Sequence, residues 1–181
     1  MRSCQVTKPL HTITHTHYTM KRLICIVTLI LSLCPRLYAT DPERRLFHFE
    51  RSTNDNIVCY DINLDGNNLN MKKPLYIYWA TLHSPYKDTG EINLMQRTVA
   101  FGFKIEKRGD NEVTGHLTAS NKLRIRICKY RGKWVAMCTI HGKQAILKRM
   151  YVKMKSAVTA EYVDAFGETT EGGEAVTVRF R

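Results

Sequence analysis

The chain has 181 residues, of which 44% are hydrophobic and 24% are charged, and its formal net charge is +12. This composition is typical of one globular domain of ordinary size and excludes a mainly disordered chain or a multi-span membrane protein. The positive charge favours anionic partners or surfaces, although it does not indicate a fold.

The charge is uneven along the chain, because all 16 acidic residues lie from Asp41 onward. Before that point, Lys21 and Arg22 directly follow Met20 and precede an apolar run over 23–33. A basic flank, an apolar run and then a small residue, here Ala39, are the successive parts of a secretory signal peptide. The run is shorter than the roughly 20 residues that a membrane span needs. We therefore expect a signal peptide at 20–39 and an exported domain at 40–181, periplasmic or secreted, with no transmembrane span in the mature chain.

Other interpretations of the N-terminus stay open. Residues 1–19 are interpreted as a mis-annotated extension upstream of a start at Met20, but a start at Met1 is not excluded. The apolar run could instead be a buried core helix. A lipoprotein anchored through Cys34 is a minority alternative, because Leu33 stands where a small residue is expected and Pro35 follows directly.

From Arg45 to the end of the chain, apolar and polar residues alternate repeatedly, which is typical of half-buried antiparallel strands. The alternating segments are 46–50, 58–64, 75–79, 98–105, 113–118, 123–128 and 176–180. Residues suited to turns separate them at 54–56, 65–68, 108–111, 131–132, 141–142 and 171–173. Only 91–96 has a plausible helical turn.

The sequence therefore predicts one all-β domain, an antiparallel β-sandwich or β-barrel-like fold of about nine or ten strands. We expect its core to include the large apolar residues of the alternating segments. These are Leu75, Ile77, Trp79, Phe101, Phe103, Ile125 and Ile127.

Three cysteines follow residue 39: Cys59, Cys128 and Cys138. A two-residue turn at Arg131-Gly132 would pair Cys128 with Val135 and place the sulfurs of Cys128 and Cys138 on opposite faces of the sheet. A three-residue turn would place them on one face but roughly 13 Å apart along the strands, whereas a disulfide needs Cα atoms within ~7 Å. We expect three free thiols. Because no Cys/His pair has metal-ligand spacing, we expect no metal and no cofactor.

Several segments together resemble a known family: 45–52, 56–61, 74–79, 96–97, 142–147 and 162–167. In this order they are similar to the family catalogued as domain of unknown function 4833, over about Arg45 to Arg179. The resemblance implies an exported bacterial protein and supports the domain boundary. It implies no particular activity.

The densest polar stretch contains the catalytic candidates His48, Glu50 and Asp61. His48 and Glu50 share one face of a strand, so the histidine could be an oriented general base. No nucleophile-elbow or metalloprotease motif accompanies them. A polar strand face with an Arg-carboxylate bridge is the favoured alternative, and the chain is more readily interpreted as a non-enzyme.

An aromatic cluster follows, in which Tyr78, Trp79 and His83 are candidates for stacking on a sugar or a flat ligand. Tyr76 and Tyr86 belong to the same cluster. Ordinary core packing explains these residues at least as well.

The most unusual feature is a basic block from Lys122 to Lys155, with eleven Lys/Arg and no acidic residue. Arg124 and Arg126 alternate with Leu123, Ile125 and Ile127, so both should point away from the core. The block is either a solvated face or a binding surface for anionic lipid, acidic glycan or a small anionic ligand.

Three classes of function stay open. The first, which we favour, is an exported non-catalytic domain that binds through the basic face or a barrel cavity. The second is a hydrolase-like enzyme using His48 and Glu50, and the third is a structural envelope component. No nucleic-acid-binding motif is present, so we expect no nucleic acid partner. The oligomeric state is left open.

Overall fold

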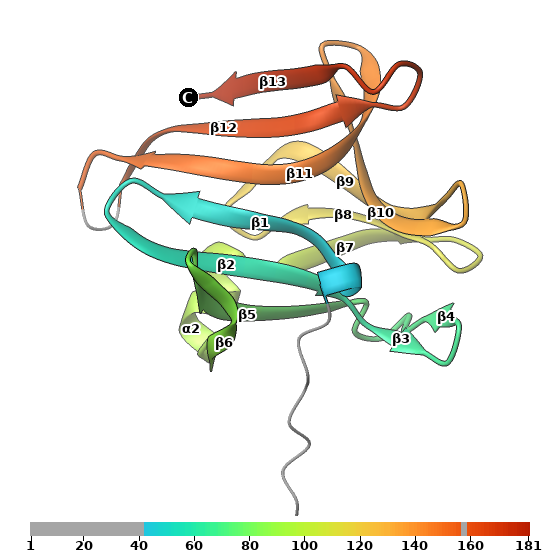
Figure 1. Cartoon of the computed structure of the whole chain (residues 1–181), viewed down its shortest axis with the longest axis horizontal. Helices are drawn as coiled ribbons and strands as arrows, with labels where there is room; N and C mark the ends of the chain where they lie inside the picture. The colour runs from blue at the N-terminus through green and yellow to red at the C-terminus, as the bar shows by residue number, and fades with distance from the viewer. Residues whose placement is uncertain (1–41, 157–158) are drawn as a thin grey trace, which may run out of the picture. The chain divides into compact units, whose positions relative to one another are not determined.

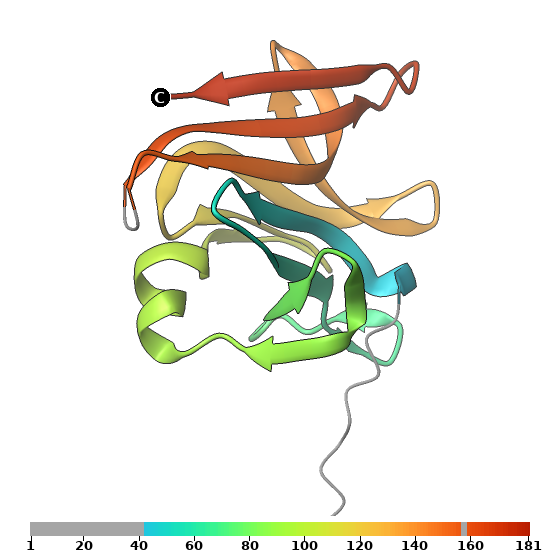
Figure 2. The same ribbon diagram turned by 60° about the vertical axis from the view of Figure 1, so that its left-hand side comes forward.

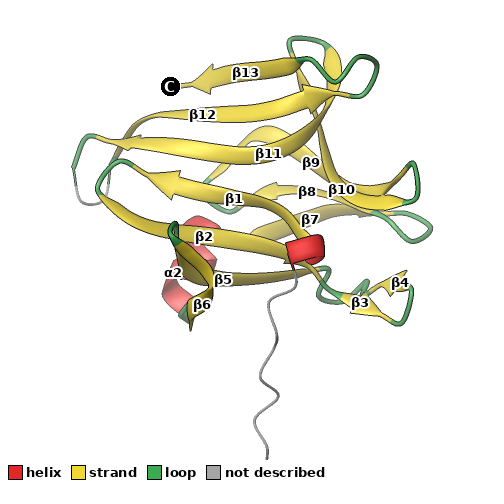
Figure 3. Cartoon of the chain, viewed as in Figure 1, coloured by secondary structure: helices red, strands yellow, loops and turns green. Residues whose placement is uncertain are grey.

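The computed structural model describes residues 42–156 and 159–181, which belong to one compact unit of the chain. Strands make up most of these residues, as Figure 3 shows in yellow. The all-β prediction is confirmed. The expectations for 1–19, for a signal peptide at 20–39 and for Cys34 lie outside the described residues.

The chain forms a short 3₁₀ turn (η1, Pro42–Arg44), thirteen strands and a helical segment. The strands are β1 (Arg45–Arg51), β2 (Asn54–Ile62), β3 (Leu64–Asp65), β4 (Asn68–Leu69), β5 (Leu75–Thr81), β6 (Ser84–Glu91), β7 (Phe103–Arg108), β8 (Val113–Leu117), β9 (Ser120–Tyr130), β10 (Lys133–Ile140), β11 (Lys143–Met154), β12 (Ala160–Thr169) and β13 (Ala175–Phe180). The helical segment consists of α2 (Leu94–Gln96) and the π-helical turn η2 (Arg97–Phe101).

The long strand β11 is where the main sheet divides. It pairs with β12 along one side, and on its other side it pairs first with β10 and then with β1. One branch runs β1-β2-β5-β6 and the other runs β10-β9-β8-β7, while β13 extends the sheet beyond β12. Figure 1 and Figure 2 show the two branches curling around a common interior.

The expectation of a purely antiparallel sheet is wrong at one ladder. β1 and β11 run parallel, with His48 opposite Arg149 and Arg51 opposite Val152. Antiparallel neighbours can be joined by a tight turn, whereas a parallel pair needs a long connection. Here all the intervening strands of the domain provide that connection.

The strand count exceeds the predicted nine or ten, with eleven strands in the main sheet and two in a small ladder formed by β3 and β4. These two strands have two residues each, too few for a visible alternation. Strand β6 was also missed. It is a polar strand at the edge of the sheet, paired with β5, and none of its side chains whose burial is described is buried, so they impose no period of two.

Two hairpins follow the predicted turn chemistry. Arg131 and Gly132 have φ of 50° and 77°, and His141 and Gly142 have φ of 50° and 79°. Positive φ at both central residues is the mark of a type I′ turn, which matches the twist of the flanking strands. The predicted turn at 54–56 is wrong, because β2 already begins at Asn54 and the turn precedes it.

The helical segment replaces the first half of the strand predicted over 98–105. Its start is fixed by Asn93, whose side chain accepts from the main-chain N–H of Gln96 while the Gln96 side chain accepts from that of Asn93. Its end is fixed by Gly102, where a Cβ atom would collide with the main-chain oxygen of Arg97. The alternation of Val99 and Phe101 indicates a strand, but the reciprocal cap at Asn93 favours the helical conformation.

The core lies between the two branches. Phe47 and Tyr60 are fully buried and stack with ring centroids 4.4 Å apart. Of the predicted core residues, Leu75, Ile125 and Ile127 are buried, whereas the others are only partly buried against the same cluster: Ile77, Trp79, Phe101 and Phe103. Two of these four, Trp79 and Phe101, line a cavity rather than a closed core.

All three described cysteines are buried free thiols, as expected. Val135 pairs with Cys128, which is the register expected for the two-residue turn. Cys128 packs in a small outer cluster with Val135 and Met137, while Cys138 packs in the main core. The two sulfurs therefore lie on opposite faces of the sheet.

Candidate functional site: an apolar cavity with two cationic side chains

A cavity of about 550 Å³ lies inside the curled sheet at the end covered by the helical segment. Both branches contribute to its walls, through β1 and β5 on one side and β8 and β9 on the other. Strands β11, β12 and β13 contribute as well, and the helical segment provides residues 95–101 except Arg97 and Thr98. Figure 2 shows this segment in yellow-green, on the same side of the domain as the end of β13.

The walls are mainly apolar and aromatic. Phe101 meets two other aromatic rings edge-on, with centroid separations of 6.2 Å to Phe49 and 5.1 Å to Trp79. Leu123 and Met150 are both buried and line the cavity from β9 and β11. A concave, largely apolar site of this size is typical of small-molecule binding, for which the usual range is about 300–1,000 Å³.

Among the described residues, the charged side chains that line the cavity are Arg51 and Lys122, and both are cationic. Arg51 lies two residues after Phe49 on β1, so both side chains point to the interior. The guanidinium carbon of Arg51 is 4.8 Å from the centroid of the Trp79 ring. Lys122 stands at the opposite wall, where its Nζ donates to the main-chain oxygen of Arg181.

Arg51 is incompletely satisfied by the protein. Its Nη2 donates to Asn54 Oδ1 at 3.4 Å, at the long limit for a hydrogen bond. Its Nε atom is buried and has no hydrogen-bond partner among the described residues. Burial lowers the pKa of the guanidinium from its ordinary value. A buried N–H without an acceptor is costly, so an acceptor on a ligand would be favourable here.

The aromatic wall is held in place by hydrogen bonds. Trp79 Nε1 donates to Gln96 Oε1 at 3.2 Å, which connects β5 to the helical segment. The buried Tyr60 hydroxyl donates to the main-chain oxygen of Phe101 at 2.9 Å. These two bonds hold the helical segment against β5 and β2, and so keep it in place over the cavity.

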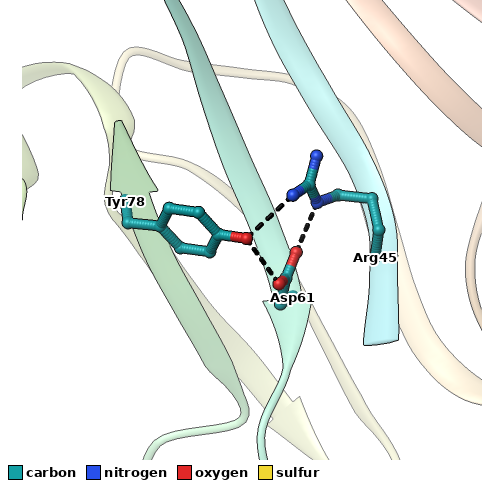
Figure 4. Close-up of polar contacts among 3 residues, drawn as sticks. All are labelled: Arg45, Asp61 and Tyr78. Carbon is teal, nitrogen blue, oxygen red and sulfur yellow. Dashed lines mark hydrogen bonds and ion pairs between the residues drawn. The ribbon is translucent and has the colours of Figure 1, made fainter. Parts of the chain in front are cut away.

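A cluster of three polar side chains lies outside the cavity, on the outer face of the branch β1-β2-β5-β6. Figure 4 shows Arg45, Asp61 and Tyr78 bonded to one another across β1, β2 and β5. Arg45 Nε donates to Asp61, Arg45 Nη2 donates to the Tyr78 hydroxyl at 2.8 Å, and that hydroxyl donates to Asp61 Oδ2 at 2.7 Å. Burial and the bond to Asp61 raise the pKa of Tyr78. Burial lowers the pKa of Arg45, but the negative charge of Asp61 and the hydrogen bond to it raise the pKa by more, so the net shift is upward.

The catalytic candidates His48 and Glu50 also lie on this outer face. His48 Nε2 is 2.9 Å from Glu50 Oε1, and Arg149 Nη1 donates to Glu50 Oε2 at 2.7 Å. This is the Arg-carboxylate bridge of the favoured alternative. Cys59 lies opposite His48 on β2, but burial raises the pKa of its thiol to about 12, so it stays protonated at neutral pH.

The aromatic candidates separate in the structure. Trp79 faces the cavity, whereas the adjacent Tyr78 faces outward and is bonded to Asp61. His83 is exposed in the turn between β5 and β6. The sequence missed Arg51 and Lys122 as site residues. An arginine at an inward position two residues from Phe49 was the signal that could have revealed the first.

The basic block is distributed over several surfaces. Arg124 and Arg126 are exposed, as expected, but Arg124 forms an ion pair with Glu106 at 3.2 Å. Three other members pair with acidic residues from distant parts of the chain, namely Lys143 with Glu174, Lys148 with Glu168 and Arg149 with Glu50. These pairs reduce the positive potential that the sequence alone suggests.

Within the described part of the chain, no group of three His, Cys, Asp or Glu side chains is placed to hold a metal ion. The same residues include no helix with the length and apolarity to cross a bilayer.

A family model described as a domain of unknown function (DUF4833) matches residues 47–179. The chain belongs to this family. The DUF4833 match includes every cavity-lining residue except Phe180. Comparisons with curated proteins and with solved structures found no match.

Proposed function

We propose that this DUF4833 domain is a non-catalytic binding domain whose cavity holds one amphipathic ligand, with an apolar body and an anionic group. The observation that supports this is the combination of apolar walls with two charged lining residues that are both cations. An apolar ligand without charge would leave Arg51 Nε without an acceptor, and a cationic ligand would be repelled.

The ligand class follows from the chemistry of the walls. Aromatic and aliphatic side chains favour a hydrocarbon chain or ring system. Arg51 favours a carboxylate or a phosphate, because a guanidinium can donate two parallel hydrogen bonds to either group. Export, expected from residues 20–39, forms part of the proposal and would place the ligand outside the cytoplasm.

The basic outer face of β9 is a weaker candidate for the binding site. Arg124 and Arg126 do point outward, but Glu106 already pairs with Arg124. The hydrolase-like alternative has weaker support, although His48 does contact Glu50. The thiol opposite His48 is protonated, and Arg149 also binds Glu50, as in the structural ion-pair alternative. The cavity is therefore the site that the geometry supports best.

Titration of the protein with dodecanoate, dodecanol and dodecylamine tests the proposal. We expect dodecanoate to bind most tightly and dodecylamine least, since the three molecules differ only in the head group. Arg51→Met should weaken dodecanoate binding roughly tenfold, the effect of losing one charged hydrogen bond of about 1.5 kcal/mol. Arg124→Met is the matched control, because Arg124 is exposed and lies outside the cavity. Equal affinity for the carboxylate and the amine would contradict the proposal.

A further inference from the structure

Exposed apolar side chains gather at one place on the domain. Among the described residues, the large hydrophobic side chains that are exposed are Leu82, Leu94, Met95 and Val99, at 42%, 80%, 75% and 65%. The last three lie within six consecutive residues of the helical segment, which we call the apolar tip. Isolated exposed apolar residues are normal, but a cluster of this kind marks an interaction surface.

The apolar tip is continuous with the cavity. Met95 and Val99 are exposed to solvent and also line the cavity, so its opening lies beside them. Leu94 is the most exposed of the three and does not line the cavity. An occupant of this surface would therefore lie at the mouth of the proposed ligand site.

The charges around the opening indicate which kind of occupant fits. Residues 92–105 contain Arg97 and Lys104, and Glu91 and Glu106 lie directly outside this range. Glu106 is already paired with Arg124 and His116, so it adds little free negative charge. The charged lining residues, Arg51 and Lys122, are both cations, and no side-chain carboxylate is among the lining residues that the structure describes. An apolar tip beside cationic lining residues is complementary to an anionic bilayer, in which acyl chains lie beneath a layer of negative head groups.

We propose that the apolar tip docks on an anionic lipid bilayer and opens the cavity toward it. Leu94 and Met95 would insert between acyl chains, while Arg97 and Lys104 would meet lipid phosphates. The proposal rests on the proposed function in one respect, because a ligand with an apolar body and an anionic head is soluble in such a bilayer and could pass between it and the cavity.

Sedimentation with lipid vesicles tests the docking. Vesicles of phosphatidylglycerol mixed with phosphatidylcholine should bind the protein, and vesicles of phosphatidylcholine alone should bind it less. Leu94→Ser should lower the affinity for the anionic vesicles roughly tenfold, as expected when one leucine no longer leaves water. Leu82→Ser is the matched control, because Leu82 is exposed in the β5–β6 turn and should not change binding. All proteins compared have the same residues 1–41, which therefore contribute equally.

Two further measurements separate docking from cavity binding. Leu94→Ser should bind dodecanoate in solution like the original protein, so loss of vesicle binding alone identifies the tip as the docking surface. Hydrogen exchange of residues 92–101 should slow on anionic vesicles, while exchange of residues 81–84 should not. Vesicle binding that survives Leu94→Ser but is lost in Arg124→Glu with Arg126→Glu would overturn the proposal in favour of the basic face. Failure to bind anionic vesicles at low salt would also overturn it, without affecting the cavity proposal.

Discussion

The Tyr60 hydroxyl of β2 donates to the main-chain oxygen of Phe101 at 2.9 Å, and this bond ties the sheet to the helical segment. Tyr60 is fully buried and its ring stacks on Phe47, so the position of its hydroxyl is fixed by packing. The same bond orients the carbonyl that follows the apolar tip. Tyr60 therefore connects the stability of the core to the shape of the cavity mouth.

Tyr60→Phe should lower the free energy of unfolding by about 1 kcal/mol, the usual net value of one hydrogen bond, because it leaves the main-chain oxygen of Phe101 without this donor. The ring itself is kept, so packing against Phe47 should not change. Urea denaturation measures the loss, and hydrogen exchange of 97–102 should accelerate more than exchange of β9. Uniform acceleration throughout the domain would show that the bond has no local role.

Asp61→Ala should destabilise the domain by about 3 kcal/mol or more, because it leaves the Arg45 guanidinium without its carboxylate in a site where both side chains are largely buried. Tyr78→Phe should cost only about 1 kcal/mol, since one neutral hydroxyl is lost and the ion pair is kept. Thermal denaturation of both variants checks the order. If Asp61→Ala unfolded like the original protein, Asp61 would be a candidate for a functional rather than a structural role.

Asp164 controls part of the acid sensitivity. Hydrogen bonds from Arg179, both at 2.7 Å, lower the pKa of the Asp164 carboxyl from its ordinary value. The folded state then binds fewer protons than the unfolded state, so this contribution is complete above the unfolded pKa of about 3.9 and is lost as the pH falls through the folded pKa. Asp164→Asn should remove this contribution. Between about pH 5 and pH 2, the free energy of unfolding should therefore change less with pH in the variant than in the original protein. An equal change of the free energy of unfolding with pH in the two proteins would contradict this role of Asp164.

The three described thiols should be inert in the folded domain. Burial raises the pKa of Cys59 to about 12 and that of Cys138 to about 11, and it also raises the pKa of Cys128. A chain that begins at Thr40 should therefore react with a thiol reagent at neutral pH only after unfolding, when three equivalents should appear. Rapid reaction of one thiol before unfolding would show that part of the sheet opens locally.

Much of the fold could be predicted because its signals are local. The turn at Arg131-Gly132 fixes the register of β9 and β10 within a few residues, and alternation then places Arg124 and Arg126 outward. The same register places Cys128 and Cys138 on opposite faces of the sheet, which agrees with both being free thiols. Local alternation failed at Val99 and Phe101, where the cap at Asn93 starts a helical segment in place of a strand.

The site could not be predicted because it depends on pairings between distant residues. Arg51 and Lys122 are 71 positions apart in the printed sequence, and nothing near either residue shows that they share a cavity. The ion pairs that neutralise part of the basic block also depend on pairings between distant residues. Glu50, for example, reaches Arg149 through the parallel ladder of β1 and β11. Sequence alternation indicates which face a side chain occupies, but not which strand lies opposite it.

The parallel ladder between His48 and Arg149 has a consequence for synthesis on the ribosome. Strand β1 is among the first described parts of the chain to emerge, yet its partner β11 emerges about a hundred residues later. Contacts of such high sequence separation slow folding, because the loop must close before the contact is gained. A nascent chain that stops before β11 can form hairpins, but the two branches of the sheet would still expose their apolar faces to water. The domain should therefore acquire its native structure only after nearly all of it has been translated, a delay that would suit the export proposed above.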